Sequence, residues 1–159
     1  MRFKLTFLFF SESEVSIIID FLDWLANPES RDSITRILRS PLVALSDTTL
    51  RYLASEGFLL IRALQEWNPT LRLPKEDKAR LEDLIKLRND LRWDREGAKA
   101  ALIERIIASG CFDSVVLASE DGVQSQANLW MLIEVVSSWE EEELLPYREF
   151  VEILKQLRE

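Results

Sequence analysis

Histidine is absent from the sequence, and cysteine occurs once, as Cys111. Without histidine the chain lacks the commonest general base, the commonest metal ligand and the partner that activates a serine or cysteine nucleophile. A single cysteine excludes an internal disulfide and a cysteine-based zinc site. We therefore expect a cytoplasmic protein in which Cys111 is a small apolar residue rather than a nucleophile.

Glycine is also scarce: the four glycines stand at positions 57, 97, 110 and 122, and no G-x-x-x-x-G-K-[ST] phosphate loop is present. The acidic run 140–143 could offer oxygen ligands to a hard cation. Consecutive helical residues point in different directions, however, so we interpret the run as a solvated face. We expect no catalytic, cofactor-binding or metal-binding residue in this chain, and therefore no enzyme activity of the chain alone.

Long apolar runs are missing as well. No stretch approaches the roughly 18–20 residues that span a bilayer, so we expect no membrane partner. The apolar start, residues 1–10, lacks the small-residue cleavage site of a signal peptide and runs directly into an acidic helix start.

The net charge of −8 is distributed unevenly. Residues 31–105 carry 15 Lys and Arg against 12 Asp and Glu, whereas residues 106–159 carry 3 against 11. A domain that binds nucleic acid by itself usually has a clear basic excess. Any contact with DNA is therefore expected to be local, or shared with another domain.

The spacing of apolar residues predicts helices over most of the chain. The predicted helices run from a Ser11 cap to residue 25, and over 32–38, 47–54, 58–67, 75–92, 98–108, 126–139 and 146–157. Ser11 and Glu14 are spaced as a capping box, and Ser46 or Asp47 caps the third helix. Residues 111–123 are predicted to be a connector, extended at 115–117. The sequence thus indicates a single all-α domain over residues 1–159, an irregular multi-helix fold of about seven to eight helices.

Five tryptophans are present. Trp24, Trp67 and Trp130 occupy apolar helical positions, which favours core packing. Trp93 and Trp139 lie at helix ends beside charges, where an exposed ring could stack on a single-stranded base, although we favour packing at a core edge there too. Asp20 and Asp23 are three residues apart, and we interpret them as the solvated side of the first helix.

Four segments of the sequence stand out together, in order along the chain. The first is Phe9-Phe10-Ser11-Glu12-Ser13-Glu14-Val15, followed by Leu22, Leu25, Asn27 and Pro28, and the second is Ile37-Leu38-Arg39-Ser40-Pro41-Leu42-Val43-Ala44-Leu45-Ser46-Asp47-Thr48-Thr49-Leu50. The third runs from Leu102 to Gly110, and the fourth is Ala127-Asn128-Leu129-Trp130-Met131-Leu132, followed by Phe150 and Leu154. In this order they resemble the insertion that interrupts the second motor domain of UvrD-like superfamily 1 DNA helicases, including the RecB and AddA helicase–nucleases. The second segment resembles the RecB/AddA pattern L-R-S-P-L-x-G-L-S-D-x-x-L.

The resemblance implies the accessory 2B-like subdomain of an ATP-dependent helicase or exodeoxyribonuclease V-type enzyme that unwinds DNA in repair and recombination. ATP and Mg would be used by the motor of the parent protein, with or without a nuclease, and no cofactor is expected in this chain. The implied partners are the rest of the motor, duplex DNA and a partner subunit.

The resemblance also indicates a candidate DNA contact. In UvrD-type members a G-I-G turn starts a helix whose backbone N–H groups hold a duplex phosphate, since a helix N-terminus offers free donors and partial positive charge. The matching residues here are 44–46, and neither glycine is kept. The candidate phosphate contacts are Arg36, Arg39, Ser46, Thr48 and Arg51. Two alternatives stay open: Ser46 or Asp47 serves only as a helix cap, and the domain is a protein-interaction module that packs against neighbouring domains or a partner subunit without touching DNA.

Overall fold

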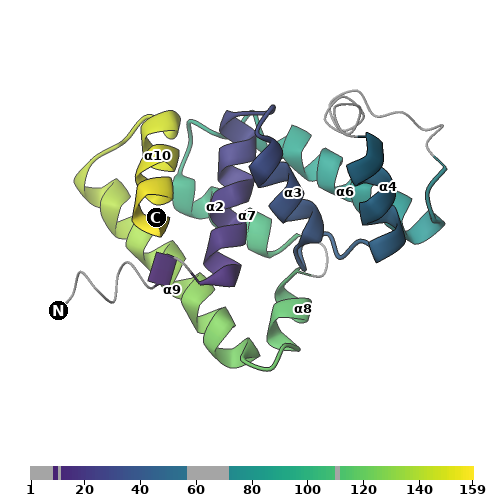
Figure 1. Ribbon diagram of the computed structural model, residues 1–159. Helices are drawn as coiled ribbons and strands as arrows, with labels where there is room; N and C mark the ends of the chain where they lie inside the picture. The colour runs from purple at the N-terminus through teal and green to yellow at the C-terminus, as the bar shows by residue number, and fades with distance from the viewer. Residues whose placement is uncertain (1–8, 11, 57–71, 110–111) are drawn as a thin grey trace.

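The computed structural model describes residues 9–10, 12–56, 72–109 and 112–159, and the ordered elements in these ranges are helices, with no strand among them (Figure 1). The helices are α2 (Ser13–Ala26), α3 (Arg31–Arg39), α4 (Asp47–Glu56), α6 (Lys75–Leu91), α7 (Lys99–Ile107), α8 (Phe112–Leu117), α9 (Gly122–Glu142) and α10 (Tyr147–Arg158). The predicted all-α class is confirmed for this part of the chain. The helix predicted at 58–67, Trp67, Gly110 and Cys111 lie outside the described residues.

Helix α2 forms the centre of the fold. It packs against α3, α7, α9 and α10, with α3 and α10 on opposite sides of it in Figure 1. The apolar residues that predicted this helix are buried, and residues 18–25 are buried without a break. A helix covered on several sides has no solvated face. The interpretation of Asp20 and Asp23 as solvated residues is therefore wrong, because both carboxylates are buried between α2 and its neighbours.

Two buried hydrogen bonds join α9 and α10 to α2. Asn128 on α9 donates its side-chain amide to the Glu14 carboxylate at 2.7 Å, and both residues are buried. The Tyr147 hydroxyl on α10 donates to the backbone carbonyl of Leu22 at 2.5 Å. Buried polar groups cost free energy unless they are paired, so these two contacts favour one arrangement of the helices.

The helix ends differ from prediction in three places. Residues 112–117 form α8 instead of an extended connector, because Phe112 and Val116 are one turn apart and both enter the core. Helix α9 starts before residue 126 and continues through the acidic residues to Glu142. The N-cap of α2 is Glu12 and not Ser11, which lies outside the described residues, and Glu14 accepts a hydrogen bond from Asn128.

The tryptophans divide between core and surface. Trp24 is buried as predicted, whereas Trp130 is 57% exposed, so its assignment to the core is wrong. Helix α9 buries the face that holds Leu129 and Val136, and Trp130 lies on another side of the helix. Trp139 stacks on Phe10 with 6.1 Å between ring centroids. Trp93 is 80% exposed, so the packing at a core edge that was favoured for it is wrong.

Across the described ranges, no helix combines the length and apolar character that crossing a membrane requires.

Candidate nucleic-acid interface

The turn between α3 and α4 is closed by its own backbone. Helix α3 ends at Arg39, and its C-cap is Ser40, whose N–H and hydroxyl both donate to the carbonyl of Ile37. The carbonyl of Ser40 in turn accepts the N–H of Ala44 at 3.0 Å and that of Val43 at 3.3 Å. The chain therefore turns tightly just after the end of α3, before α4 begins.

Ala44 has a left-handed backbone, with φ of 53°. This conformation brings Cβ close to the following carbonyl oxygen and favours glycine. Arg80, on α6, donates from Nη1 to the Ala44 carbonyl at 2.5 Å. The turn thus holds a non-glycine residue in a conformation that a glycine would adopt without strain.

Ser46 caps α4, as predicted, since its Oγ accepts the N–H of Thr49 at 3.4 Å. Its own donors, however, go to a carboxylate on α6. The Ser46 hydroxyl donates to Asp77 Oδ2 at 2.5 Å, its backbone N–H donates to Oδ1 at 3.3 Å, and the Thr49 hydroxyl also donates to Oδ2. Asp77 therefore occupies donors that the resemblance assigns to a DNA phosphate.

The electrostatics of Asp77 fit this role. Burial alone would raise its pKa, but the hydrogen bonds from Ser46 and Thr49 and the nearby Arg80 lower it below the ordinary value of 3.8. The carboxylate is therefore ionised at neutral pH and repels a second anion at the same place.

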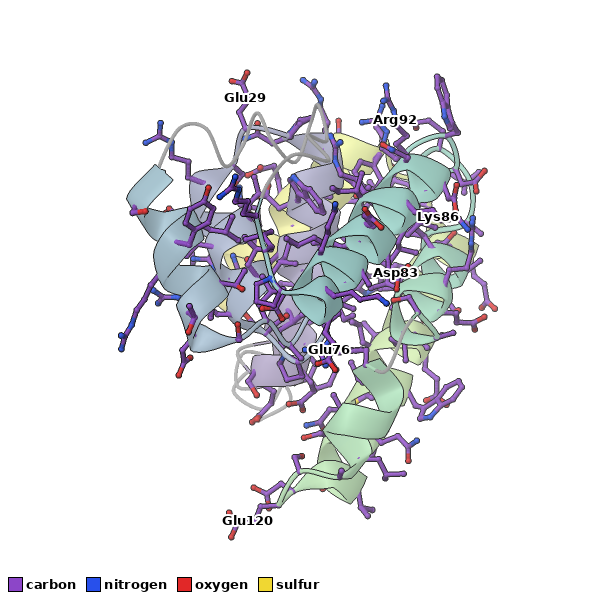
Figure 2. All side chains as sticks on the ribbon, turned by 90° about the vertical axis from the view of Figure 1, so that its right-hand side faces the viewer. Glu29, Glu76, Asp83, Lys86, Arg92 and Glu120 are labelled. Atoms are coloured by element: carbon purple, nitrogen blue, oxygen red, sulfur yellow. The ribbon has the colours of Figure 1, made fainter. Side chains whose placement is uncertain are left out.

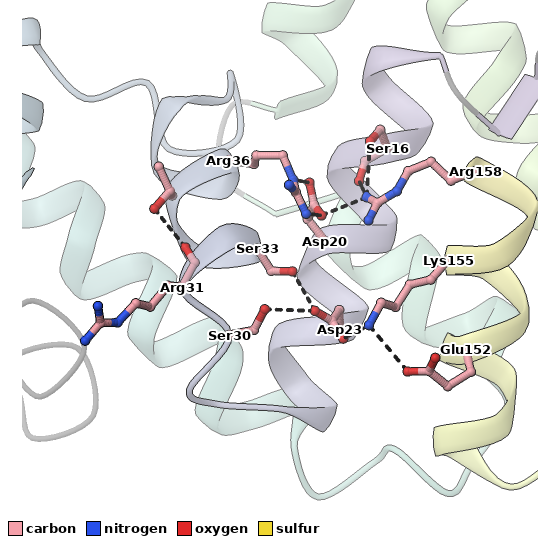
Figure 3. A network of polar contacts seen from close by, with 11 residues as sticks. Ser16, Asp20, Asp23, Ser30, Arg31, Ser33, Arg36, Glu152, Lys155 and Arg158 are labelled. Atoms are coloured by element: carbon pink, nitrogen blue, oxygen red, sulfur yellow. Dashed lines mark hydrogen bonds and ion pairs between the residues drawn. The ribbon is translucent and has the colours of Figure 1, made fainter. Parts of the chain in front are cut away.

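Arg36 is likewise bound within the protein. Its guanidinium donates from Nε and Nη2 to the two oxygens of Asp20, each at 2.9 Å, as Figure 3 shows. The hydrogen bonds to Asp20 raise the pKa of Arg36, against a smaller opposing effect of burial. Arg158 on α10 donates to the same carboxylate at 2.7 Å. The bidentate pair with Asp20 therefore uses the Nε–Nη2 edge of the Arg36 guanidinium.

Asp23 extends this network one turn along α2. It accepts the hydroxyls of Ser33 at 2.6 Å and Ser30 at 3.0 Å, and pairs with Lys155 at 3.3 Å (Figure 3). Burial would raise the pKa of Asp23, but these three partners together lower it. The two acids on α2 thereby fix α3 on one side and α10 on the other.

The five predicted contacts consequently fall into two groups. Arg36 and Ser46 are directed to the buried acids Asp20 and Asp77, while the side chains of Arg39, Thr48 and Arg51 are exposed at the end of α3 and the start of α4. Asp77 and Arg80 were not predicted, because they lie more than 30 residues away, on α6, and no local pattern pairs them with the turn.

The acidic run at the end of α9 also has an unpredicted role. Glu140 accepts the backbone N–H groups of Lys99 at 3.1 Å and Ala100 at 2.7 Å, so it caps the N-terminus of α7. It is half-buried rather than fully solvated. In the part of the chain that the structure describes, no group of three or more acidic, histidine or cysteine side chains is placed to hold a metal ion.

No protein-family model matches the sequence, and no curated protein matches it either.

Proposed function

We propose that this chain is a 2B-like accessory domain of a UvrD/RecB/AddA-type DNA helicase or exodeoxyribonuclease V-type helicase–nuclease. The observation that carries the proposal is the left-handed backbone at Ala44. The RecB/AddA pattern has glycine at this position, and glycine is the residue that such a backbone favours. The turn therefore has the shape that the pattern calls for, although the residue differs.

A second observation supports the same assignment. Glu14 belongs to the first segment of the resemblance and Asn128 to the last, and the two are joined by a buried hydrogen bond across 114 positions. The first and last segments of the resemblance thus belong to one packed unit. The pairing gives a structural reason for both positions in the pattern.

Within this proposal, the side chains that contact duplex phosphates are Arg39, Thr48 and Arg51. Phosphate binding by such side chains is electrostatic and weakens with salt. A phosphate at the α4 N-terminus would first have to displace Asp77. Other parts of the parent protein would supply the motor, which uses ATP and Mg. Movement of this domain against the motor would regulate unwinding.

The test is binding of a fluorescent forked duplex to the chain at two salt concentrations. The double variant Arg39→Glu plus Arg51→Glu is compared with Lys86→Glu plus Arg92→Glu, which makes the same charge change at exposed positions around the end of α6. We expect the first pair to weaken binding at least tenfold at low salt and to reduce the salt slope by about 2. Equal weakening by both pairs would contradict a local DNA contact.

A helical interaction module without DNA contact is the second candidate. It is favoured by Asp77, which occupies the Ser46 donors, and by Asp20, which engages Arg36. Absence of any salt-dependent duplex binding by the unmodified chain at low salt would select this candidate.

A further inference from the structure

Large apolar side chains are exposed mainly on one hairpin. Among the described residues, Leu117, Val123, Trp130 and Met131 are all at least 46% exposed, and all lie at the end of α8 or in the first half of α9. Figures 1 and 2 show this hairpin extending from the body of the domain, with Glu120 at its tip. Val123, Ala127 and Trp130 follow helical spacing and form one exposed stripe, with Met131 beside it.

The hairpin is held firmly. Phe112 and Val116 anchor α8 in the core, and a Cβ on Gly122 would lie only 2.0 Å from the carbonyl oxygen of Leu117, so the two helices meet at close range. At the other side of α9, Gln124 donates to Asn128, and Asn128 donates to Glu14 on α2. The exposed stripe is therefore presented on a fixed support.

The sequence around the stripe is acidic. Residues 106–147 contain eight Asp and Glu and neither Lys nor Arg. Among them, Glu120 and Asp121 are exposed at the tip of the hairpin, and Glu134 is exposed one turn beyond Trp130 on the same side of α9. An apolar stripe bordered by charge of one sign is complementary to an amphipathic helix of the opposite sign.

We propose that the α8–α9 hairpin, defined by the apolar residues Leu117, Val123, Trp130 and Met131 and the acids Glu120, Asp121 and Glu134, is a docking surface for a basic amphipathic helix of a partner protein. The apolar face of the partner covers Val123 and Trp130, and its Lys and Arg side chains reach Glu120 and Glu134. An exposed tryptophan at the centre of a stripe is a typical binding hot spot. This inference uses residues apart from the proposed DNA contact and does not depend on the helicase assignment.

The experiment measures fluorescence anisotropy of a labelled 18-residue helical peptide with leucine on one face and lysine on the other, titrated with the full chain. A peptide with glutamate in place of lysine is the control for charge. We expect binding of the lysine peptide only, with Trp130→Ala weakening it at least tenfold. Trp93→Ala, the matched change at another exposed tryptophan, is expected to alter the affinity less than twofold.

The local role of the acids is tested by two charge reversals of equal size. Glu120→Lys plus Glu134→Lys is expected to weaken binding at least fivefold, while Glu29→Lys plus Asp83→Lys, at exposed positions elsewhere (Figure 2), leaves it within twofold. Equal effects of both reversals would mean non-specific attraction to the net negative charge and would overturn the proposal.

Two further results would overturn it. One is equal binding of the glutamate peptide. The other is concentration-dependent self-association of the chain that Trp130→Ala abolishes, because a second copy would then be the occupant. Failure of any of these tests leaves the Arg39 and Arg51 experiment unaffected, since the two surfaces share no residue.

Discussion

Replacement of Asp20 by asparagine is expected to destabilise the fold by about 3 kcal/mol. The Asp20 side chain is 1% exposed and receives two hydrogen bonds from Arg36 and one from Arg158. Asparagine keeps the shape but removes the charge and points an amide N–H₂ at guanidinium donors. Breaking a buried ion pair costs about 3–5 kcal/mol when the remaining charge stays buried. The lower value applies because the Arg36 side chain is 50% exposed and can turn to water, whereas that of Arg158 is 16% exposed.

Urea unfolding followed by far-ultraviolet circular dichroism measures this loss. A drop in Tm of about 6–12 °C should accompany it, at about 2–4 °C for each kcal/mol in a domain of this size. Asp83→Asn, an exposed aspartate in the middle of α6, is the matched control and should cost less than about 0.5 kcal/mol. A loss below about 1 kcal/mol for Asp20→Asn would refute the reasoning, because the carboxylate would then behave as a solvated one.

Three further predictions concern stability and use the same unfolding assay. Ala44→Gly should stabilise the fold by about 0.5–1 kcal/mol, since relief of the left-handed strain exceeds the entropy that glycine adds to the unfolded chain; a destabilised variant would contradict the strain. Gly122→Ala should cost about 1–3 kcal/mol because its Cβ meets a backbone carbonyl at 2.0 Å, while Gly97→Ala, with its nearest atom at 3.3 Å, should cost less. Asp23 and Asp77 have pKa values below the ordinary 3.8, so their stabilisation is complete above that pH and is lost as the pH falls through the lowered values. Asp23→Asn should therefore flatten the fall in stability below about pH 4, and an unchanged profile would contradict the assignment.

The helices and most of the core follow from the spacing of apolar residues. Helices α3, α6, α7 and α10 begin and end within two residues of the predicted positions, because proline and polar breaks mark their ends. The error at α8 arises from residues 115–117, a β-branched pair and a leucine that by local preference suggest extended chain. Burial of Phe112 and Val116 on one face outweighed that preference.

The burial of Asp20 and Asp23 could not be predicted from the sequence of their own helix. On a surface helix, a pair of acids between apolar residues marks the solvated side. Helix α2 is instead enclosed, and the cations that neutralise its acids come from α3 and α10, up to 138 residues away. A local pattern cannot show what packs from the other sides.

Partners that are distant in the sequence also decide which charges of the candidate site are available to a ligand. Arg36 and Ser46 were predicted to contact a phosphate, but Arg36 already binds the buried carboxylate of Asp20 and Ser46 that of Asp77. The slight basic excess of residues 31–105 therefore overstates the number of Lys and Arg side chains that could bind DNA. Residues 106–147, by contrast, contain eight acids and neither Lys nor Arg. Attraction of a ligand depends on charges that remain exposed rather than on totals. The acids Glu120, Asp121 and Glu134 of the α8–α9 hairpin stay exposed, whereas of the three arginines proposed to contact DNA only Arg39 and Arg51 are exposed without serving a buried carboxylate.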